Sequence, residues 1–280
     1  MESKDLFQSV HHHTKSQLDN YLKEIESIFE CNVISIFGDI GFIIAKSVGR
    51  AIELLPDTDK KEILVVILQT SGGLAEVAER IIETIRDRYS KLYFVIPDYA
   101  MSAGTILAMG GDKIYMGYSS SLGPIDPQIF QGDRFLSALG YLNEYDDLNK
   151  KAKKGDLTTV EFSLINQMDL SFLYECKQAK KLTVDLIKKW LPQYMFKDNN
   201  DSPDAKVKQA EDIASKFGSE EWRSHTRMLS RETVKNIGLN IDNIEDNQNL
   251  MLSVNRYASL LDDFLLQNNV RNFVHSINYF

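Results

Sequence analysis

The sequence has few cysteines and no long hydrophobic run. Cys31 and Cys176 are the two cysteines in 280 residues, too few for the disulfide framework of a small secreted domain. Both stand in apolar, amphipathic surroundings typical of a reduced interior. Residues 1–30 are polar and contain no signal-peptide core, and no other window reaches the apolar length that spans a bilayer. We therefore expect a cytoplasmic protein that is neither secreted nor inserted into a membrane.

Positive charge is also scarce. The formal net charge is −8, and no long basic run carries interleaved aromatic residues. The dense lysine groups at 149–155 and 177–182 are interpreted as solvated helix faces. This balance argues against a nucleic-acid partner and against acidic macromolecular partners in general.

The sequence offers no complete metal site. His11, His12 and His13 are consecutive, and consecutive histidines cannot close a tetrahedral site without further ligands, which are not evident nearby. We expect no metal and no cofactor, and we interpret the segment as disordered or helical.

What the chain does contain is enough apolar sequence for a large core, because 43% of its residues are hydrophobic and 10% are aromatic. Continuous apolar, β-branched runs alternate with helical spacing, which predicts a parallel α/β sheet covered on both faces. The expected strands are 32–37, 62–70, 91–97 and a short one at 113–117, and the expected helices of this part are 14–30, 43–55, 74–85 and 101–111.

The second half of the chain is expected to be mainly helical. Residues 119–128 form a loop, because Pro124 and Pro127 disrupt ladder pairing. Helical patterns follow at 135–190 and 205–217, with a terminal helix and tail from 250. We divide the chain into an N-terminal helical segment (1–30), an α/β domain with helical insertions (31–245) and a C-terminal helical tail (246–280).

Two unusual turns follow strands of the predicted sheet, where ligands bind in open parallel sheets. The first is Ser71-Gly72-Gly73, whose glycines let the backbone approach a bound group closely. Amide groups at a helix start can point at an anion, either a phosphate or the oxyanion of an acyl transfer. A pair of glycines is also typical of a plain structural turn.

The second turn contains Ser102, between Met101 and an Ala-Gly pair. Serine at a helix start is commonly an N-cap. The alternative is a nucleophile, which the combination of both turns on one sheet edge favours, because one turn supplies donors and the other a hydroxyl.

Three segments together resemble a known family: "LQTSGGLAEVAERI", "VIPDYAMSAGTILAMGGDKIYMG" and "SSLGPIDPQI", in this order and spacing. They are similar to the serine dehydrogenase proteinase family, which belongs with the proteolytic subunit of Clp and signal peptide peptidase A in the Clp/crotonase fold. The likeness extends through "WRSHTRMLSRETVKNIGL" and covers roughly residues 30–245.

The resemblance implies a spiral of ββα units and a serine endopeptidase. Ser102 would be the nucleophile that forms an acyl-enzyme with a peptide substrate, and water would then release the product. Gly72 and Gly73 would supply one N–H of the oxyanion hole and Ala103 the second. The resemblance also implies a homo-oligomer that encloses the sites and needs no cofactor.

The general base is where the sequence departs from these relatives. Asp126 stands where the Clp subunit has its base histidine, and the helical stretch comparable to the one that holds the lysine of signal peptide peptidases contains none. Two candidates follow. His225 can accept a proton near neutral pH, and Lys177 could do so if burial lowered its pKa.

The order of these residues leaves the activity open. If Asp126 and His225 took the two remaining triad places in swapped order, the carboxylate would separate serine from imidazole and Ser102 would not be activated. Asp126 could instead form an Asx turn before Pro127. The alternatives to a peptidase are therefore a catalytically weak or inactive relative that binds peptides or proteins, and a crotonase-like enzyme of acyl-CoA thioesters.

Overall fold

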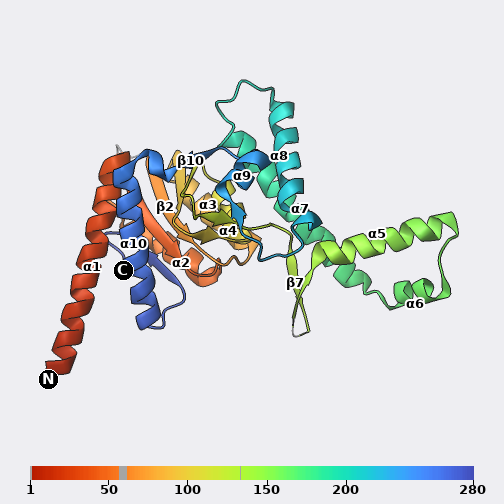
Figure 1. Cartoon of the computed structure of the whole chain (residues 1–280), viewed down its shortest axis with the longest axis horizontal. Coiled ribbons are helices and arrows are strands. Elements are labelled where there is room, and N and C mark those ends of the chain that lie inside the picture. The colour runs from red at the N-terminus through yellow and green to blue at the C-terminus, as the bar shows by residue number, and fades with distance from the viewer. Residues whose placement is uncertain (1, 57–61, 133) are drawn as a thin grey trace.

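The computed structural model describes residues 2–56, 62–132 and 134–280, and it contains a central sheet of six strands (Figure 1). The sheet order is β10-β5-β3-β2-β1-β11, and every neighbouring pair is parallel except β1 with β11. The parallel sheet predicted from the apolar runs is thus present. Its strands are β1 (Asn32–Phe37), β2 (Ile63–Gln69), β3 (Lys91–Ile96), β5 (Lys113–Met116), β10 (Ile241–Asn243) and β11 (Phe273–His275).

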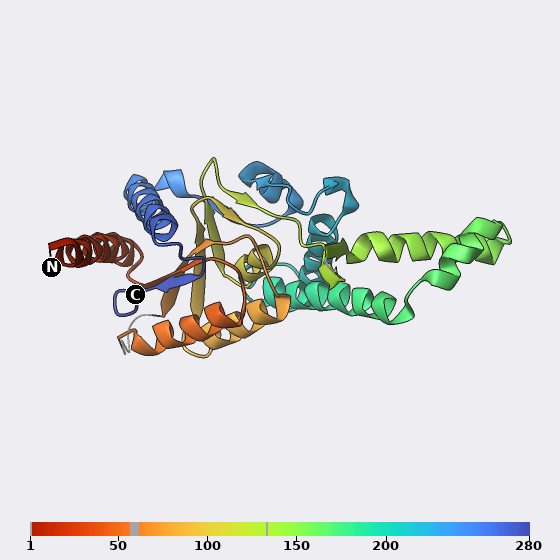
Figure 2. The ribbon, with the colours of Figure 1, turned by 90° about the horizontal axis from the view of Figure 1, so that it is seen from below.

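Helices cover both faces of this sheet, as Figure 2 shows. Alternate side chains of a strand point to opposite faces, so Leu64 and Val66 of β2 join one buried cluster while Val65 and Ile67 join another. The first cluster contains helices α2 (Phe42–Leu54), α3 (Ala75–Arg86) and α4 (Ala103–Met109), and the second contains α1 (Glu2–Phe29) and α10 (Gln248–Gln267).

The two ends of the chain meet on one face. Helix α1 packs against α10, and β11 adds an antiparallel edge strand to β1. The expected C-terminal tail at 246–280 therefore includes a strand of the main sheet, which the helical interpretation missed. The N-terminal histidines lie within α1, so their segment is helical.

A second helical layer and an extended arm follow the sheet. Helices α7 (Leu170–Gln193) and α8 (Pro203–Phe217) pack on each other, and α7 also contacts α3 and α4. Helices α5 (Ala138–Lys154) and α6 (Thr159–Gln167) form the arm, which projects away from the body on the right of Figure 1.

The expected helix at 135–190 begins too early. Residues Arg134–Ser137 form β8, which pairs with β7 (Gln128–Gln131) in a hairpin. Phe130 and Phe135 face each other across it, with ring centroids 5.2 Å apart. Gly132 adopts a positive φ of 69° at the turn, and Ser137 then caps α5 by accepting a hydrogen bond from the amide of Gly140. Cross-strand pairing thus overrides the local helical spacing.

Candidate active site

A three-stranded sheet brings three separate segments to one place. Its strands are β4 (Tyr99–Ala100), β6 (Ser121–Leu122) and β9 (Leu229–Ser230), in that order, with β4 parallel to β6 and β9 antiparallel to it. The carboxyl ends of β4 and β6 and the amino end of β9 therefore lie at the same edge. Ser102 lies two residues after the end of β4, Asp126 four residues after the end of β6, and His225 four residues before the start of β9.

A cavity of about 820 Å³ opens at this edge. Its walls come from the 71–73 turn, the start of α4, the loop and hairpin at 125–135, helix α7 and the loop before β9. The lining residues on which the site depends are Gly72, Gly73, Ser102, Ala103, His225, Thr183, Asp39, Glu76, Phe130 and Phe135.

Ser102 has an unusual backbone conformation and does not cap its helix. Its φ is 50° and its ψ is −116°, and a positive φ is uncommon outside glycine. Although it occupies the N-cap position of α4, its hydroxyl accepts no capping hydrogen bond. In the part of the chain that the structure describes, we find no hydrogen bond of this hydroxyl at all. The geometry does not support the N-cap interpretation, and it leaves the half-buried hydroxyl directed to the cavity.

Neighbouring groups hold this turn in place. The amide of Gly104 donates to the Met101 carbonyl at 2.7 Å. The buried Thr105 hydroxyl lies 2.8 Å from the Ala100 carbonyl oxygen and accepts a hydrogen bond from the Gly123 amide at 3.0 Å. The strain of a positive φ, of order 1–3 kcal/mol, is thus offset by a network of buried hydrogen bonds around it.

Gly72 lies directly against Ser102. Its φ is +117°, and a Cβ there would stand 2.9 Å from the Cβ of Ser102, so a side chain does not fit. Its amide donates to Thr70 Oγ1 at 3.0 Å, and its carbonyl accepts from the Ile40 amide at 2.7 Å. The Gly72 amide is therefore already engaged, which does not favour the oxyanion-hole role that the resemblance implies for it.

Gly73 differs from Gly72 in this respect. It pairs with Ile40 as a parallel bridge, in which the neighbouring Gly72 carbonyl and Leu74 amide make the hydrogen bonds. The Gly73 amide then points away from Ile40, and within the described ranges it has no acceptor. The Ala103 amide, at the first position of α4, also has none there. Both residues line the Ser102 cavity.

His225 and Asp126 form a hydrogen-bonded pair. Nδ1 of His225 lies 2.9 Å from Oδ1 of Asp126, and the exposed fractions of the two side chains are 26% and 15%. Oδ2 of Asp126 accepts a further hydrogen bond from Gln128 Nε2 at 2.8 Å. A proton on Nδ1 directed to the carboxylate leaves Nε2 of the imidazole as a basic lone pair.

The order of the pair relative to Ser102 is not the swapped order, in which the carboxylate would separate serine from imidazole. His225 lines the cavity together with Ser102, whereas Asp126 is not among the lining residues. The imidazole therefore lies on the cavity side and the carboxylate behind it. The structure contains no direct hydrogen bond between Ser102 and His225, so the two side chains share a cavity without touching in this way.

Lys177 lies elsewhere. It is exposed, and its Nζ stands 5.4 Å from the centroid of the Tyr145 ring of helix α5. The residues of α7 that face the cavity are Ala179, Leu182 and Thr183. The structure thus does not bring Lys177 to Ser102, and nothing in its surroundings provides the burial that the sequence argument required.

Sequence reasoning missed two parts of the cavity wall. Phe130 and Phe135 line it from the β7–β8 hairpin, which was not predicted, and Phe135 was expected to begin a helix. Asp39 and Glu76 add carboxylates to the lining, and Ser71 donates a hydrogen bond to Asp39 at 2.5 Å. A glycine between two apolar pairs, Ile129-Phe130 and Phe135-Leu136, was the one signal that could have predicted the hairpin.

Among the residues that the structure describes, no group of three or more histidines, cysteines, aspartates or glutamates is arranged to hold a metal ion. Within those same ranges, no helix combines the length and apolar composition needed to cross a bilayer.

The sequence matches a family model described as ClpP-like SDH-type serine proteinase, over residues 2–258. It is also 29% identical over 200 residues to the uncharacterized protein MJ1495 of Methanocaldococcus jannaschii, and 36% identical over 87 residues to the uncharacterized protein MJ0137 of the same organism. These matches cover 71% and 31% of this chain, but 57% and 29% of the relatives. The chain thus spans about half or less of the length of these curated relatives.

Solved structures with a similar arrangement have low sequence identity to this chain. A serine-to-alanine variant of the 1510-N membrane-bound stomatin-specific protease matches with a TM-score of 0.47 and 15% identity, covering 79% of this chain and 82% of that one. A ClpP1 variant from Listeria monocytogenes matches with a TM-score of 0.40 and 14% identity, covering 80% of this chain and 98% of that one.

Proposed function

The chain belongs to the family of ClpP-like SDH-type serine proteinases, and from this premise we propose that it cleaves peptide bonds through an acyl-enzyme on Ser102. The observation that carries the proposal is the order of three side chains at one edge. Ser102 and His225 share the cavity, and Asp126 stands behind the imidazole at 2.9 Å. This is the order that a Ser-His-Asp system needs.

In the proposed reaction His225 is the general base. Its Nε2 takes the proton of the Ser102 hydroxyl as Oγ attacks the carbonyl carbon of the scissile peptide bond. Asp126 accepts the hydrogen bond of Nδ1–H and stabilises the imidazolium. The imidazolium then gives its proton to the leaving amine, and a water molecule hydrolyses the Ser102 ester in the same way.

The Gly73 and Ala103 amides would bind the oxyanion of the tetrahedral intermediate. Both lie at the cavity and neither has an acceptor within the described ranges. Free amides fixed by the backbone stabilise developing negative charge without reorganisation, and one such donor is worth about 10²–10³ in kcat. Gly72 then has a shaping role, because its own amide binds Thr70.

The missing Ser102–His225 hydrogen bond favours a second candidate, a relative that binds peptides but cleaves them weakly or not at all. Catalytic hydrogen bonds are often long in ligand-free enzymes and tighten when substrate binds, so this observation alone does not decide against catalysis. The strained, non-capping Ser102 favours the peptidase, because such strain is typical of functional sites.

Three further expectations stay predictions. A protein or peptide is the proposed substrate, and the location is expected to be cytoplasmic. A homo-oligomer is expected, and the exposed apolar side chains of α6, Val160, Phe162 and Leu164, support an association through the arm.

The test is cleavage of a pool of internally quenched peptides by the wild type and three variants. Ser102→Ala should abolish cleavage, and His225→Ala should lower it by about 10²–10⁴, the usual contribution of a general base. Lys177→Ala is the matched control and should cleave as the wild type does. Equal cleavage by Ser102→Ala and wild type would contradict the peptidase, and a loss in Lys177→Ala alone would move the base role to that lysine.

A further inference from the structure

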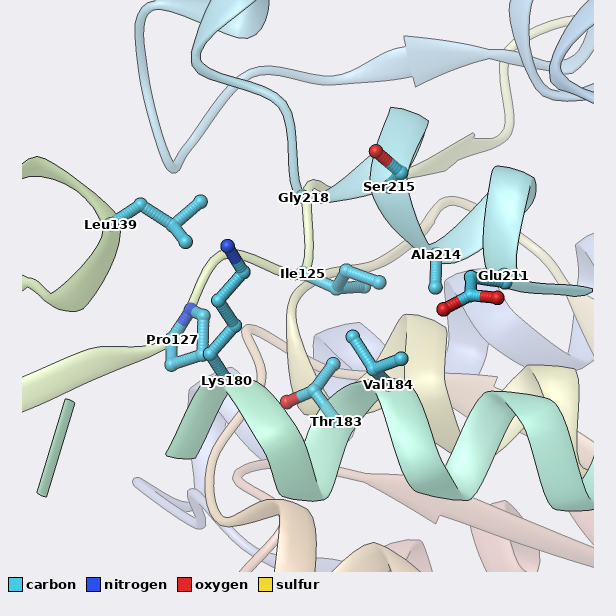
Figure 3. A pocket seen from close by; sticks show the side chains of 10 residues that line it. All are labelled: Ile125, Pro127, Leu139, Lys180, Thr183, Val184, Glu211, Ala214, Ser215 and Gly218. Carbon is cyan, nitrogen blue, oxygen red and sulfur yellow. The ribbon is translucent and has the colours of Figure 1, made fainter. Parts of the chain in front are cut away.

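A second cavity, of about 270 Å³, adjoins the Ser102 cavity. The two share Ile125, Pro127 and Thr183 in their walls, so a peptide bound at Ser102 can extend a side chain from one into the other. Figure 3 shows the ten residues that line it, from the 125–127 loop, α5, α7 and α8.

The body of this cavity is apolar. Ile125, Leu139 and Ala214 are buried, and Val184 and Pro127 complete the apolar wall. The volume is below the range of about 300–1,000 Å³ in which drug-sized ligands bind. Methylene groups of an inserted side chain would therefore be stabilised by removal of apolar surface from water.

The charges at the rim do not cancel. Lys180 and Glu211 are the two charged lining residues, and they stand on opposite sides of the cavity in Figure 3. The Glu211 carboxylate already pairs with Lys188, at 3.3 Å. Lys180 has no acidic partner within the ranges that the structure describes. The rim therefore carries one uncompensated positive charge.

We propose that this cavity is a substrate subsite that selects glutamate, with Lys180 as the residue that recognises the carboxylate. The inference rests on the proposed function, since it requires a peptide at Ser102. Glutamate fits both features, because its methylene groups match the apolar wall and its carboxylate reaches the rim. Glutamine has the same shape without the charge, and lysine places a like charge at Lys180.

The experiment uses the full chain and a pool of internally quenched peptides in which glutamate, glutamine, leucine or lysine is scanned through three positions on either side of the cleaved bond. An exposed ion pair gives a preference of about two- to fivefold. The wild type should therefore cleave the glutamate peptide about two- to fivefold faster than the glutamine peptide at one position. This ratio should shrink at high salt, because screening weakens exposed charge pairs.

Lys180→Met should reduce the glutamate-to-glutamine ratio to about one, and Lys180→Glu should favour lysine at that position. Lys181→Met removes the neighbouring exposed lysine, which does not line the cavity, and should keep the wild-type ratio. Val184→Trp should fill the cavity and slow cleavage of the glutamate, glutamine and leucine peptides alike.

Labelling of Ser102 by a fluorophosphonate, measured in parallel, separates the two proposals. Labelling with no position at which glutamate is preferred, or with a preference unchanged in Lys180→Met, overturns the subsite and leaves the peptidase standing. A wild type that is neither labelled nor active on any peptide overturns both.

Discussion

At the scale of single residues, Ser102 and the 71–73 turn constrain each other. Gly72 leaves no room for a Cβ beside Ser102, and Ser102 itself holds a φ that costs about 1–3 kcal/mol. Their chemistry could be expected from the sequence, because small residues after strands predict close backbone approach. The Asp126–His225 contact could not, since it joins residues 99 positions apart whose geometry depends on the complete fold.

The Asp126–His225 pair gives the prediction at this scale. Asp126→Asn removes the charge that stabilises the imidazolium and can fix the imidazole in the wrong tautomer, so kcat for peptide cleavage should fall by about 10²–10⁴. The cleavage rate and the melting temperature are measured for each variant, because an unchanged melting temperature shows that a loss of cleavage does not come from misfolding. Asp242→Asn is the control, because Asp242 pairs with Lys113 on the surface at 3.5 Å with half of each side chain exposed. Activity retained by Asp126→Asn would exclude a catalytic role for the pair.

At the scale of elements, Thr70 links the end of β2 to the 71–73 turn and to the turn before α4. Its amide donates to the Tyr99 carbonyl at 3.1 Å, and its carbonyl accepts from the Met101 amide at 2.9 Å. Its hydroxyl accepts from the Gly72 amide, and its methyl group packs where a side chain on Gly104 would stand. One buried residue thus sets the spacing between the 71–73 turn and Ser102.

Thr70→Val keeps the shape of the side chain and removes the acceptor of the Gly72 amide. A buried donor without a partner costs about 1–3 kcal/mol, so the free energy of unfolding in urea should fall by that amount and labelling of Ser102 should slow. Thr84→Val is the matched control, since Thr84 is half-buried on α3 and its hydroxyl donates only to the Arg80 carbonyl of the same helix. A change of similar size in both variants would contradict the linking role of Thr70.

The elements themselves were predictable to different degrees. Long apolar runs such as 63–69 predict their strands, because burial on both faces leaves a signal in each segment. The hairpin β7–β8 and strand β11 were missed, since they are short and form through pairing with partners that local patterns do not reveal. The family match nevertheless confirms the predicted Clp/crotonase-like fold with its helical C-terminal segment.

At the scale of the whole molecule, a buried polar network joins both ends of the chain to the sheet. His275 of β11 is fully buried, with Nε2 at 3.0 Å from Asp19 of α1 and Nδ1 at 2.9 Å from the Tyr257 hydroxyl of α10. Tyr257 in turn lies 2.6 Å from Ser35 of β1. Burial lowers the pKa of His275 to about 4, although the hydrogen bond with Asp19 acts in the opposite direction.

This shift predicts a loss of stability in acid. The unfolded chain has a histidine pKa of about 6.5, so between pH 6.5 and 4 the unfolded state binds a proton that the folded state does not. The free energy of unfolding therefore falls as the pH drops through this window, by up to about 3 kcal/mol from His275 alone. Urea unfolding at pH 7 and pH 4.5 should show a smaller pH difference for His275→Gln than for the wild type. Equal differences would mean that His275 does not titrate between the two states in this range.

The central claim is that Ser102 is a nucleophile activated by His225, and labelling with a fluorophosphonate tests it most directly. The folded wild type is incubated with the probe, the adduct is mapped by mass spectrometry, and Ser102→Ala and His225→Ala are run alongside. We expect an adduct on Ser102 in the wild type, no adduct at that position in Ser102→Ala, and labelling slowed by about 10²–10⁴ in His225→Ala. A folded wild type that takes no label on Ser102, or a His225→Ala variant labelled at the wild-type rate, would contradict it.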